Sequence, residues 1–206
     1  ALQGDRLAVL DRLARSGVGI GLIHYAVEPT IELGQKEFIN WTGGAFEIDY
    51  SVNPHWTAAF TNFPNHPVTQ GVKPFATLDE WYFNMRFRDG LVGVTPILTA
   101  VPPASTMERK DGPHEGNPAV RAMVAKQTPQ TMMWVSEKAQ GGRGFGFTGG
   151  HFHTSWKNDD QRKLVLNAIV WIAGAEVPEG GVVSSLTDAD LAANLDPKPP
   201  RPAAAK

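Results

Sequence analysis

Residues 17–26 (GVGIGLIHYA) form an apolar, glycine-rich run that is interrupted by one ionisable side chain, His24. Such a short apolar run predicts a buried strand of an α/β protein. In these proteins ligands bind at the carboxyl edge of the parallel sheet. His24, at the end of the predicted strand, is therefore the first candidate for a functional site.

The segment before this run predicts a helix over residues 5–16 (DRLAVLDRLARS), with Leu7, Leu10 and Leu13 on one face and Gly17 as its C-cap. A helix that leads directly into a buried strand is half of a right-handed crossover unit. The first strand of that unit needs more room than residues 1–4 provide. We therefore expect the opening part of the domain to be absent from this sequence, as in a processed or truncated chain.

Composition narrows the classes to which the chain can belong. Its 206 residues, net charge of -2 and 42% hydrophobic content favour one globular domain with appendages. It contains no cysteine, which excludes disulfides, thiolate nucleophiles and iron–sulfur clusters and leaves histidine, carboxylate or water as metal ligands. Because lysine and arginine are not clustered, we predict no nucleic-acid partner. No run approaches the roughly 20 apolar residues of a membrane span.

Apolar and β-branched runs predict further strands. Four lie at residues 55–60, 80–87, 94–101 and 131–137. Another is expected within residues 141–150 (GGRGFGFTGG), where the glycines let a backbone or a ligand approach closely. Residues 28–51 show no sustained period, and they predict a long loop with a helical turn, of the kind that lies over a site.

The later part of the chain divides by composition. Proline-rich residues 102–130 predict an exposed insertion with little regular structure. Residues 158–174 predict a helix with Asn158 as its N-cap. Residues 1–176 are the expected domain and residues 177–206 a C-terminal extension, which ends in PKPPRPAAAK and cannot build a core. Within it, residues 185–195 predict one short capped surface helix.

Five motifs occur in an order that resembles one known family. They are GVGIGLIHYA, FPNHPVTQGV, DEWYF, GRGFGFTGGHFHTSW and NAIVWIAG. Together they resemble the ThuA-like (trehalose utilisation) domain family over residues 1–174, which corresponds to the later part of such a domain. The resemblance implies a class I glutamine-amidotransferase-like, or flavodoxin-like, α/β fold. This is an open, mainly parallel sheet with helices on both faces, here incomplete at its N-terminus.

The resemblance also implies which chemistry to expect. In the amidotransferases the catalytic cysteine follows a strand at the place that His24 holds here, and a chain without cysteine cannot hydrolyse glutamine through a thiolate. Family members are associated with the breakdown of trehalose and related disaccharides through 3-keto intermediates made by partner oxidoreductases. The implied partners are a small sugar ligand and either a partner oxidoreductase or a second copy of the chain. Relatives are linked to exported proteins, which favours the periplasm or secretion over the cytoplasm.

Three histidines and one carboxylate are the candidate metal ligands and catalytic groups. His151 and His153 follow a strand expected beside the first one, so either or both can meet His24 at the same sheet edge. Two imidazoles with a carboxylate and an open position are a common site for a divalent ion such as zinc. We favour Glu80 over Asp79 as the carboxylate that points into the pocket, because neighbours in a strand face opposite sides.

Each candidate also has a structural interpretation. The histidines can be hydrogen-bonded structural residues, and Glu80 can pair with Arg86 or Arg143 instead of acting as a general acid or base. Asp79 is expected to be a cap or an ion-pair partner.

The remaining histidines carry weaker expectations. His66 is expected to brace a turn, and His55 stands at a strand start with no predicted orientation. His114, inside the proline-rich segment, is expected to be in solvent.

Aromatic side chains can stack on sugar rings. Candidate substrate-binding residues are Tyr25, Trp41, Trp81 and Trp156, although most aromatic residues of such a chain must lie in its core. The motif GRGFGF resembles a dinucleotide fingerprint, but it follows a turn and leads into a strand, the reverse of the required context. We predict no nicotinamide cofactor, and no flavin or haem.

The sequence leaves two hypotheses for the function of this protein. The first is an enzyme that acts on a sugar or a 3-keto-sugar derivative by metal-assisted hydrolysis, elimination or isomerisation, with His24, Glu80 and His151 as its catalytic residues. The second is a non-catalytic carbohydrate-binding or scaffold subunit of a larger assembly. A bound divalent ion with an open coordination position would favour the enzyme.

Overall fold

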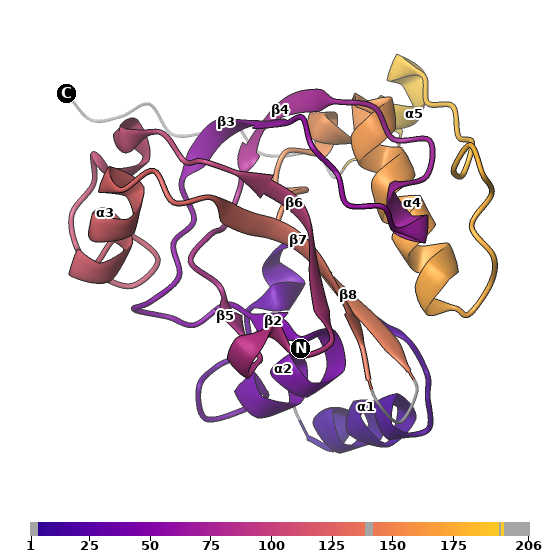
Figure 1. Cartoon of the computed structure of the whole chain (residues 1–206), viewed down its shortest axis with the longest axis horizontal. Helices are drawn as coiled ribbons and strands as arrows, with labels where there is room; N and C mark the ends of the chain where they lie inside the picture. The colour runs from indigo at the N-terminus through magenta and orange to yellow at the C-terminus, as the bar shows by residue number, and fades with distance from the viewer. Residues whose placement is uncertain (1–3, 139–141, 194, 196–206) are drawn as a thin grey trace.

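The computed structural model describes residues 4–138, 142–193 and 195, and its centre is a four-stranded sheet with helices on either side (Figure 1). The sheet has the order β1 (Ile20–Ile23), β8 (Arg143–Phe147), β7 (Gln130–Glu137), β6 (Val94–Ala100). The helices are α1 (Arg6–Arg15), α2 (Gln35–Thr42), α3 (Pro118–Ala125), α4 (Asp159–Ile172) and α5 (Asp188–Ala192). The remaining strands are β2 (Gly44–Ala45), β3 (His55–Phe60), β4 (Phe75–Glu80) and β5 (Arg86–Phe87). The 3-10 turns are η1 (His24–Val27), η2 (Pro67–Thr69), η3 (Asp89–Leu91), η4 (Ala104–Met107) and η5 (His153–Lys157).

The α/β class, the open sheet and the flanking helices are as the sequence predicts, but the described sheet is mixed rather than mainly parallel. Its β1–β8 pair is parallel, whereas β7 is antiparallel to both β8 and β6. The connection from the end of β7 at Glu137 to the start of β8 at Arg143 is too short for the crossover that a parallel pair requires. The chain therefore turns straight back, and the glycine-rich β8 lies between β1 and β7.

Each face of the sheet has its own hydrophobic core. On one face α4 and the β3–β4 hairpin pack over β6, β7 and β8. Alternate residues of β3 are buried there, namely Trp56, Ala58 and Phe60, as the alternation in HWTAAF predicts. On the other face α1 and α2 cover β1 and the Trp134 side of β7. These two cores leave the carboxyl end of β1 open at the edge of the sheet.

The prediction of one strand over residues 80–87 is wrong for most of that range, because β4 ends at Glu80 and only residues 86–87 form a strand, β5. β4 pairs with β3 along its whole length, and Glu80 lies opposite His55, the first residue of β3. Beyond Glu80 the hairpin has no further partner, and the chain enters a buried segment in which Asn84 has a φ of 57°. Glu80 therefore lies at the end of a strand, beside the carboxyl end of β1.

Two helices form where the sequence predicts irregular structure. α2 replaces part of the predicted loop and buries Phe38 and Trp41, which lie one helical turn apart. α3 lies inside the proline-rich segment, because Pro118 occupies the first turn and Asn117 accepts a hydrogen bond from the Val120 amide at 2.9 Å. The insertion at residues 102–130 is thus an ordered part of the fold rather than an exposed segment with little regular structure.

The C-terminal extension contains the expected surface helix. α5 begins with a capping box in which the side chains of Thr187 and Asp190 each accept a backbone hydrogen bond. Residues 1–3, 139–141, 194 and 196–206, including the proline-rich end, lie outside the described residues. Among the described residues, no helix has both the length and the apolar character needed to cross a membrane.

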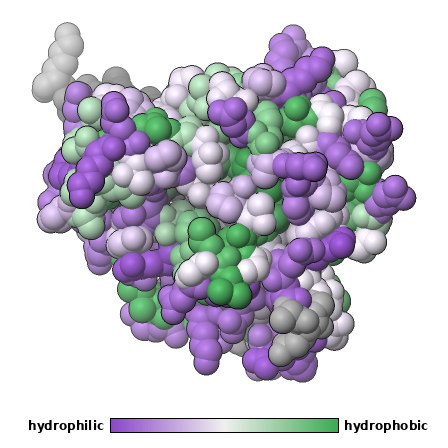
Figure 2. Space-filling view, viewed as in Figure 1, coloured by the Kyte–Doolittle hydropathy of each residue, from purple (hydrophilic) through white to green (hydrophobic). Residues whose placement is uncertain are grey.

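Polar side chains cover most of the face seen in Figure 2, with apolar ones in small groups between them. The exposed large apolar residues come from several elements, including Val9 of α1, Val92 after η3 and Val183 before α5. This mixture is typical of a surface in contact with water.

Candidate active site

His24 stands at the carboxyl end of β1, where the strand stops and η1 begins. Its backbone has a φ of 53°, which is uncommon for a residue other than glycine. Its Nδ1 lies 2.9 Å from the Thr148 carbonyl oxygen, just beyond β8. Because a carbonyl can only accept, Nδ1 carries a proton, and Nε2 is the nitrogen that faces Glu80 and His151.

Glu80 and Asp79 end β4 and face opposite ways. The Glu80 Oε2 lies 3.4 Å from His24 Nε2, and its Oε1 accepts a hydrogen bond from Asn53 Nδ2 at 3.0 Å. Asp79 is fully buried and accepts hydrogen bonds from three consecutive amides, those of Gly150, His151 and Phe152. The structure thus places Glu80 in the site and makes Asp79 the cap of the loop that carries His151.

The structural alternative for Glu80 does not occur. The guanidinium of Arg86 pairs with Glu47 at 2.8 Å, and that of Arg143 lies 3.8 Å from Glu137.

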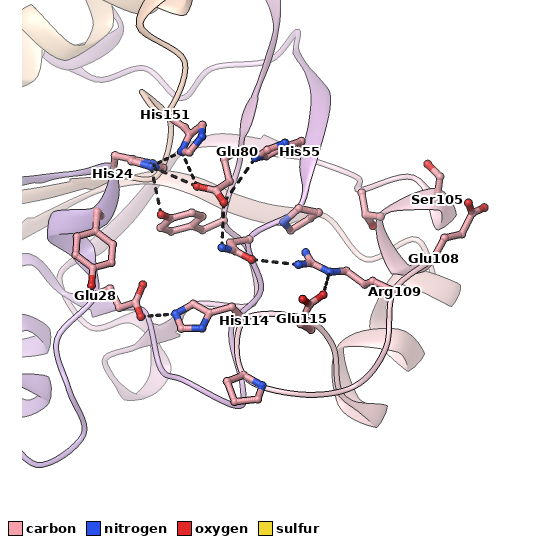
Figure 3. A pocket seen from close by; sticks show the side chains of 16 residues that line it. His24, Glu28, His55, Glu80, Ser105, Glu108, Arg109, His114, Glu115 and His151 are labelled. Carbon is pink, nitrogen blue, oxygen red and sulfur yellow. Dashed lines mark hydrogen bonds and ion pairs between the residues drawn. The ribbon is translucent and has the colours of Figure 1, made fainter. Parts of the chain in front are cut away.

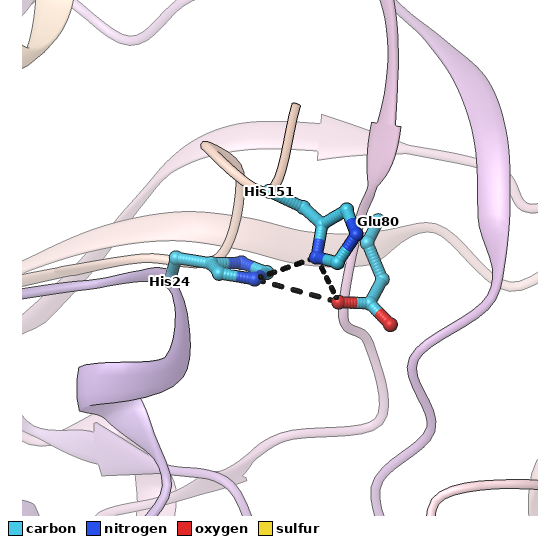
Figure 4. Close-up of side chains that lie close together, drawn as sticks. All are labelled: His24, Glu80 and His151. Carbon is cyan, nitrogen blue, oxygen red and sulfur yellow. Dashed lines mark hydrogen bonds and ion pairs between the residues drawn. The ribbon is translucent and has the colours of Figure 1, made fainter. Parts of the chain in front are cut away.

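His151 completes a cluster with His24 and Glu80 (Figure 4). Its Nδ1 lies 3.2 Å from His24 Nε2 and 2.9 Å from Glu80 Oε2. The three residues come from the ends of β1 and β4 and from the loop after β8. Strand ends thus bring together groups that are far apart in the sequence.

Two of the three separations between the facing atoms match those of a metal site. All three atoms lie within 4.8 Å of one another. Tetrahedral zinc with bonds of about 2.0–2.1 Å places neighbouring ligand atoms roughly 3.3–3.4 Å apart. The separations of 3.2 and 3.4 Å from His24 Nε2 agree with this, and the 2.9 Å between His151 and Glu80 is that of a hydrogen bond. The Nδ1–H of His24 on a backbone carbonyl is also the usual support of a metal-binding histidine. The donor set therefore fits Zn²⁺ or another divalent first-row ion.

The cluster shifts the pKa values of its members. Burial alone would lower the pKa of His24, but the hydrogen bonds to Glu80 and Thr148 outweigh it and raise the pKa above its ordinary 6.5. Burial would raise the pKa of Glu80, but contact with His24 and the charge of His151 lower it below 4.5. Burial and the nearby Glu80 charge raise the pKa of Tyr82 far above its usual range. At neutral pH Glu80 is therefore a carboxylate and Tyr82 a neutral hydroxyl, 3.3 Å from His24 Nε2.

The cluster lines a cavity of about 950 Å³ (Figure 3), at the upper end of the range usual for small-molecule sites. Besides the cluster, its walls come from η1 and the residue after it, the start of β3 and the insertion at residues 102–130. On the insertion side, Arg109 Nε donates to Glu115 Oε2 at 2.7 Å. The cavity is thus bordered by both acidic and basic groups.

Comparison with known proteins agrees with the resemblance noted in the sequence. The ThuA family model, described as trehalose utilisation, matches residues 2–172. The chain belongs to the ThuA family. No protein with a curated description matches it. A crystal structure of a ThuA-like protein from Bacteroides uniformis is similar with a TM-score of 0.59 and 16% identity, over 85% of this chain and 66% of that chain. That likeness shows the fold.

In this ThuA-family chain His153 is not brought to the cluster. The chain bends after His151, and η5 begins at His153, so the two rings do not share a strand face. The His153 Nε2 lies instead 2.9 Å from the Leu191 carbonyl oxygen of α5. The expectation of an extended segment, and with it the placing of His153 as a metal ligand, is corrected here.

The aromatic candidates divide between the core and the cavity. Trp41 and Trp81 are 1% and 0% exposed, lie in the two cores and do not line the cavity. Trp156 packs against the core, with its ring 6.0 Å from that of Phe147. Tyr25 is 70% exposed and lines the cavity, so it alone of these four is placed to contact a ligand there.

The residues that line the cavity and that were not expected there from the sequence include His55, His114 and Glu28. The His55 Nε2 lies 3.7 Å from Glu80 Oε1, so this ring faces the cluster. His114 is not in solvent, because its Nε2 lies 2.5 Å from Glu28 Oε1 and its ring stacks on Phe46. The pairing of β3 with β4 would have revealed His55, whereas no local signal links residues 28 and 114.

Proposed function

We propose that this cavity is the active site of a metal-assisted enzyme acting on a disaccharide or a 3-keto-sugar derivative. Membership of the ThuA family supports a role related to trehalose utilisation in general. The reaction we favour occurs next to a carbonyl group, as elimination or isomerisation, with hydrolysis as the third option. The observation that carries this proposal is the triangle of His24, Glu80 and His151 in the cavity wall.

Each residue of the site has a proposed part. His24 Nε2, His151 Nδ1 and Glu80 Oε2 would hold the ion, which would polarise a carbonyl oxygen or activate a water. The Tyr82 hydroxyl stays protonated and can donate to an oxygen of the substrate. Tyr25, at the exposed rim, offers a ring face to a sugar.

Metal analysis of the purified, untagged protein tests the proposal. We expect about one divalent ion per chain and, in His24→Ala, a binding constant at least 100-fold weaker, since loss of even a supporting contact costs 10–100-fold. His153→Ala is the matched control, because this histidine faces α5 and should leave the metal content unchanged. Absence of metal from the wild-type protein, after incubation with Zn²⁺, Mn²⁺ and Fe²⁺, would favour the non-catalytic carbohydrate-binding or scaffold role.

Metal affinity should depend on pH with a defined sign. A proton on His24 competes with the ion, and the raised pKa of His24 means that this competition begins above pH 6.5. Glu80 has a lowered pKa and remains a carboxylate in this range. We therefore expect the apparent affinity for Zn²⁺ to fall at least about tenfold per pH unit between pH 6.5 and 5.5.

Titration calorimetry in two buffers of different ionisation enthalpy checks this prediction, because it counts the protons released with the metal. An affinity that stays constant from pH 7.5 to 5.5 would mean that His24 is not a ligand.

A further inference from the structure

The cavity contains a second carboxylate–imidazole pair, separate from the cluster of His24, Glu80 and His151. Glu28 follows η1, and His114 comes from the insertion, 86 residues further along the chain. The His114 Nε2 donates to Glu28 Oε1 at 2.5 Å. Both side chains line the cavity, with exposed fractions of 12% for Glu28 and 32% for His114 (Figure 3).

Glu28 differs from the other carboxylates that line the cavity. Both oxygens of Glu80 are engaged by the cluster and by Asn53. Glu115 pairs with Arg109, and Glu108 is exposed. Glu28 is sheltered, yet among the described residues only His114 donates to it, and only to Oε1. Its Oε2 is therefore open to a ligand in the cavity.

The position of the Glu28–His114 pair is fixed by ring stacking and by a backbone hydrogen bond of His114. The His114 ring stacks on the fully buried Phe46, with centroids 5.2 Å apart and planes at 24°. The His114 backbone has a φ of 63°, and its carbonyl accepts a hydrogen bond from the Asn53 amide at 3.2 Å. The side chain of the same Asn53 holds Glu80. Asn53 thus links the Glu28–His114 pair to the cluster of His24, Glu80 and His151.

A strained backbone at a polar residue is a feature of functional sites. Six residues other than glycine have a positive φ in the described chain, and the two that line the cavity are His24 and His114. His24 belongs to the cluster with Glu80 and His151, and His114 belongs to the pair with Glu28.

We infer that Glu28 is the general base of the cavity and that His114 is the residue that positions it, an inference that rests on the proposed function. Glu28 Oε2 takes a proton from the carbon next to the carbonyl of a keto-sugar. The C–H electron pair forms a C=C bond, and the carbonyl π pair moves to oxygen, to which the Tyr82 hydroxyl donates. For isomerisation, the hydroxyl on the deprotonated carbon gives its proton to the enolate oxygen, its oxygen forms the new C=O bond, and the C=C pair takes the proton back from Glu28 at the former carbonyl carbon. For elimination, the enolate re-forms its C=O bond, the C=C pair shifts to join the deprotonated carbon to the next carbon along, and the glycosyloxy group on that next carbon leaves with the bonding pair and takes the proton from Glu28 as an alcohol.

The test measures solvent deuterium exchange and product release with the 3-keto derivative of trehalose as the probe, in metal-loaded protein. We expect Glu28→Gln to lower kcat about 10²–10⁴-fold with KM little changed. His114→Asn, chosen because asparagine tolerates a positive φ, should lower kcat at least about tenfold. The double variant should lose no more than Glu28→Gln alone, since His114 acts through Glu28.

Matched controls are Glu32→Gln and His153→Asn, which lie outside the cavity and should exchange at the wild-type rate. Metal content measured in every variant separates the two proposals. Wild-type exchange with full activity in Glu28→Gln would overturn the inference and leave the proposed function standing. Absence of exchange by metal-loaded wild-type protein would overturn both the inference and the proposed reaction, whereas absence of metal would already contradict the proposed function.

Discussion

Gly144→Ala is expected to destabilise the protein by about 3 kcal/mol or more, at or beyond the upper end of the usual cost of overpacking. A Cβ at this position of β8 would lie 2.2 Å from the carbonyl oxygen of Trp41 and 2.9 Å from the Cα of Thr42. Both are backbone atoms at the end of α2, so no side-chain rotation relieves the contact. Either α2 must move away from the sheet or β8 must leave its place between β1 and β7. The free energy of unfolding in urea measures the effect.

Gly180→Ala is the matched control, because a Cβ there would meet no atom within 4 Å and the φ of Gly180 is not positive. Its free energy of unfolding should stay within about 0.5 kcal/mol of the wild-type value. Equal unfolding midpoints for the two variants would mean that α2 does not pack on β8 as closely as described.

The sequence predicts the parts of the fold that depend on local pattern. The alternation of β3, the cap of α4 at Asn158 and the close approach at the glycines of β8 all follow from neighbouring residues. It also predicts that His24 and His151 meet at one edge of the sheet, because each follows a strand. Glu80 was expected beside them but at the start of a strand, whereas it ends β4. What approaches Gly144 was not predictable, since α2 itself was expected to be a loop.

The rest of the site depends on contacts between distant segments. The pairing of Glu28 with His114 requires the insertion to fold back over η1. The prolines of that segment predict exposed, irregular structure and give no sign of this contact. His153 was misplaced for a local reason. Residues 151 and 153 share a face only in an extended chain, and the three amides that donate to Asp79 bend the chain at that point.

Asp79→Ala is expected to weaken both the fold and the metal site. The Asp79 carboxylate is fully buried and accepts hydrogen bonds from the amides of Gly150, His151 and Phe152 at 2.8, 2.9 and 3.3 Å. Its removal leaves these three donors, and the Glu80 amide that also donates to Asp79 Oδ1 at 2.8 Å, without their acceptor, at a cost of about 3–5 kcal/mol in the free energy of unfolding. The loop that carries His151 also loses its anchor, so the affinity for Zn²⁺ should fall about 10–100-fold, as for other supporting residues of metal sites.

Asp160→Ala is the matched control for Asp79→Ala, because it also removes an aspartate that accepts a backbone hydrogen bond. Asp160 lies in the first turn of α4, accepts one exposed hydrogen bond from the Lys73 amide at 2.8 Å, and does not line the cavity. The Asp160→Ala variant should lose about 1 kcal/mol at most in the free energy of unfolding and keep its metal affinity unchanged.

The two parts of the Asp79 prediction are measured independently. The free energy of unfolding is measured without metal, and the affinity for Zn²⁺ is measured well below the unfolding temperature. An Asp79→Ala protein that is destabilised but binds Zn²⁺ as tightly as the wild type would show that His151 is held by its other neighbours. Added Zn²⁺ would then stabilise both proteins equally, because the stabilisation depends only on the dissociation constant and the free metal concentration.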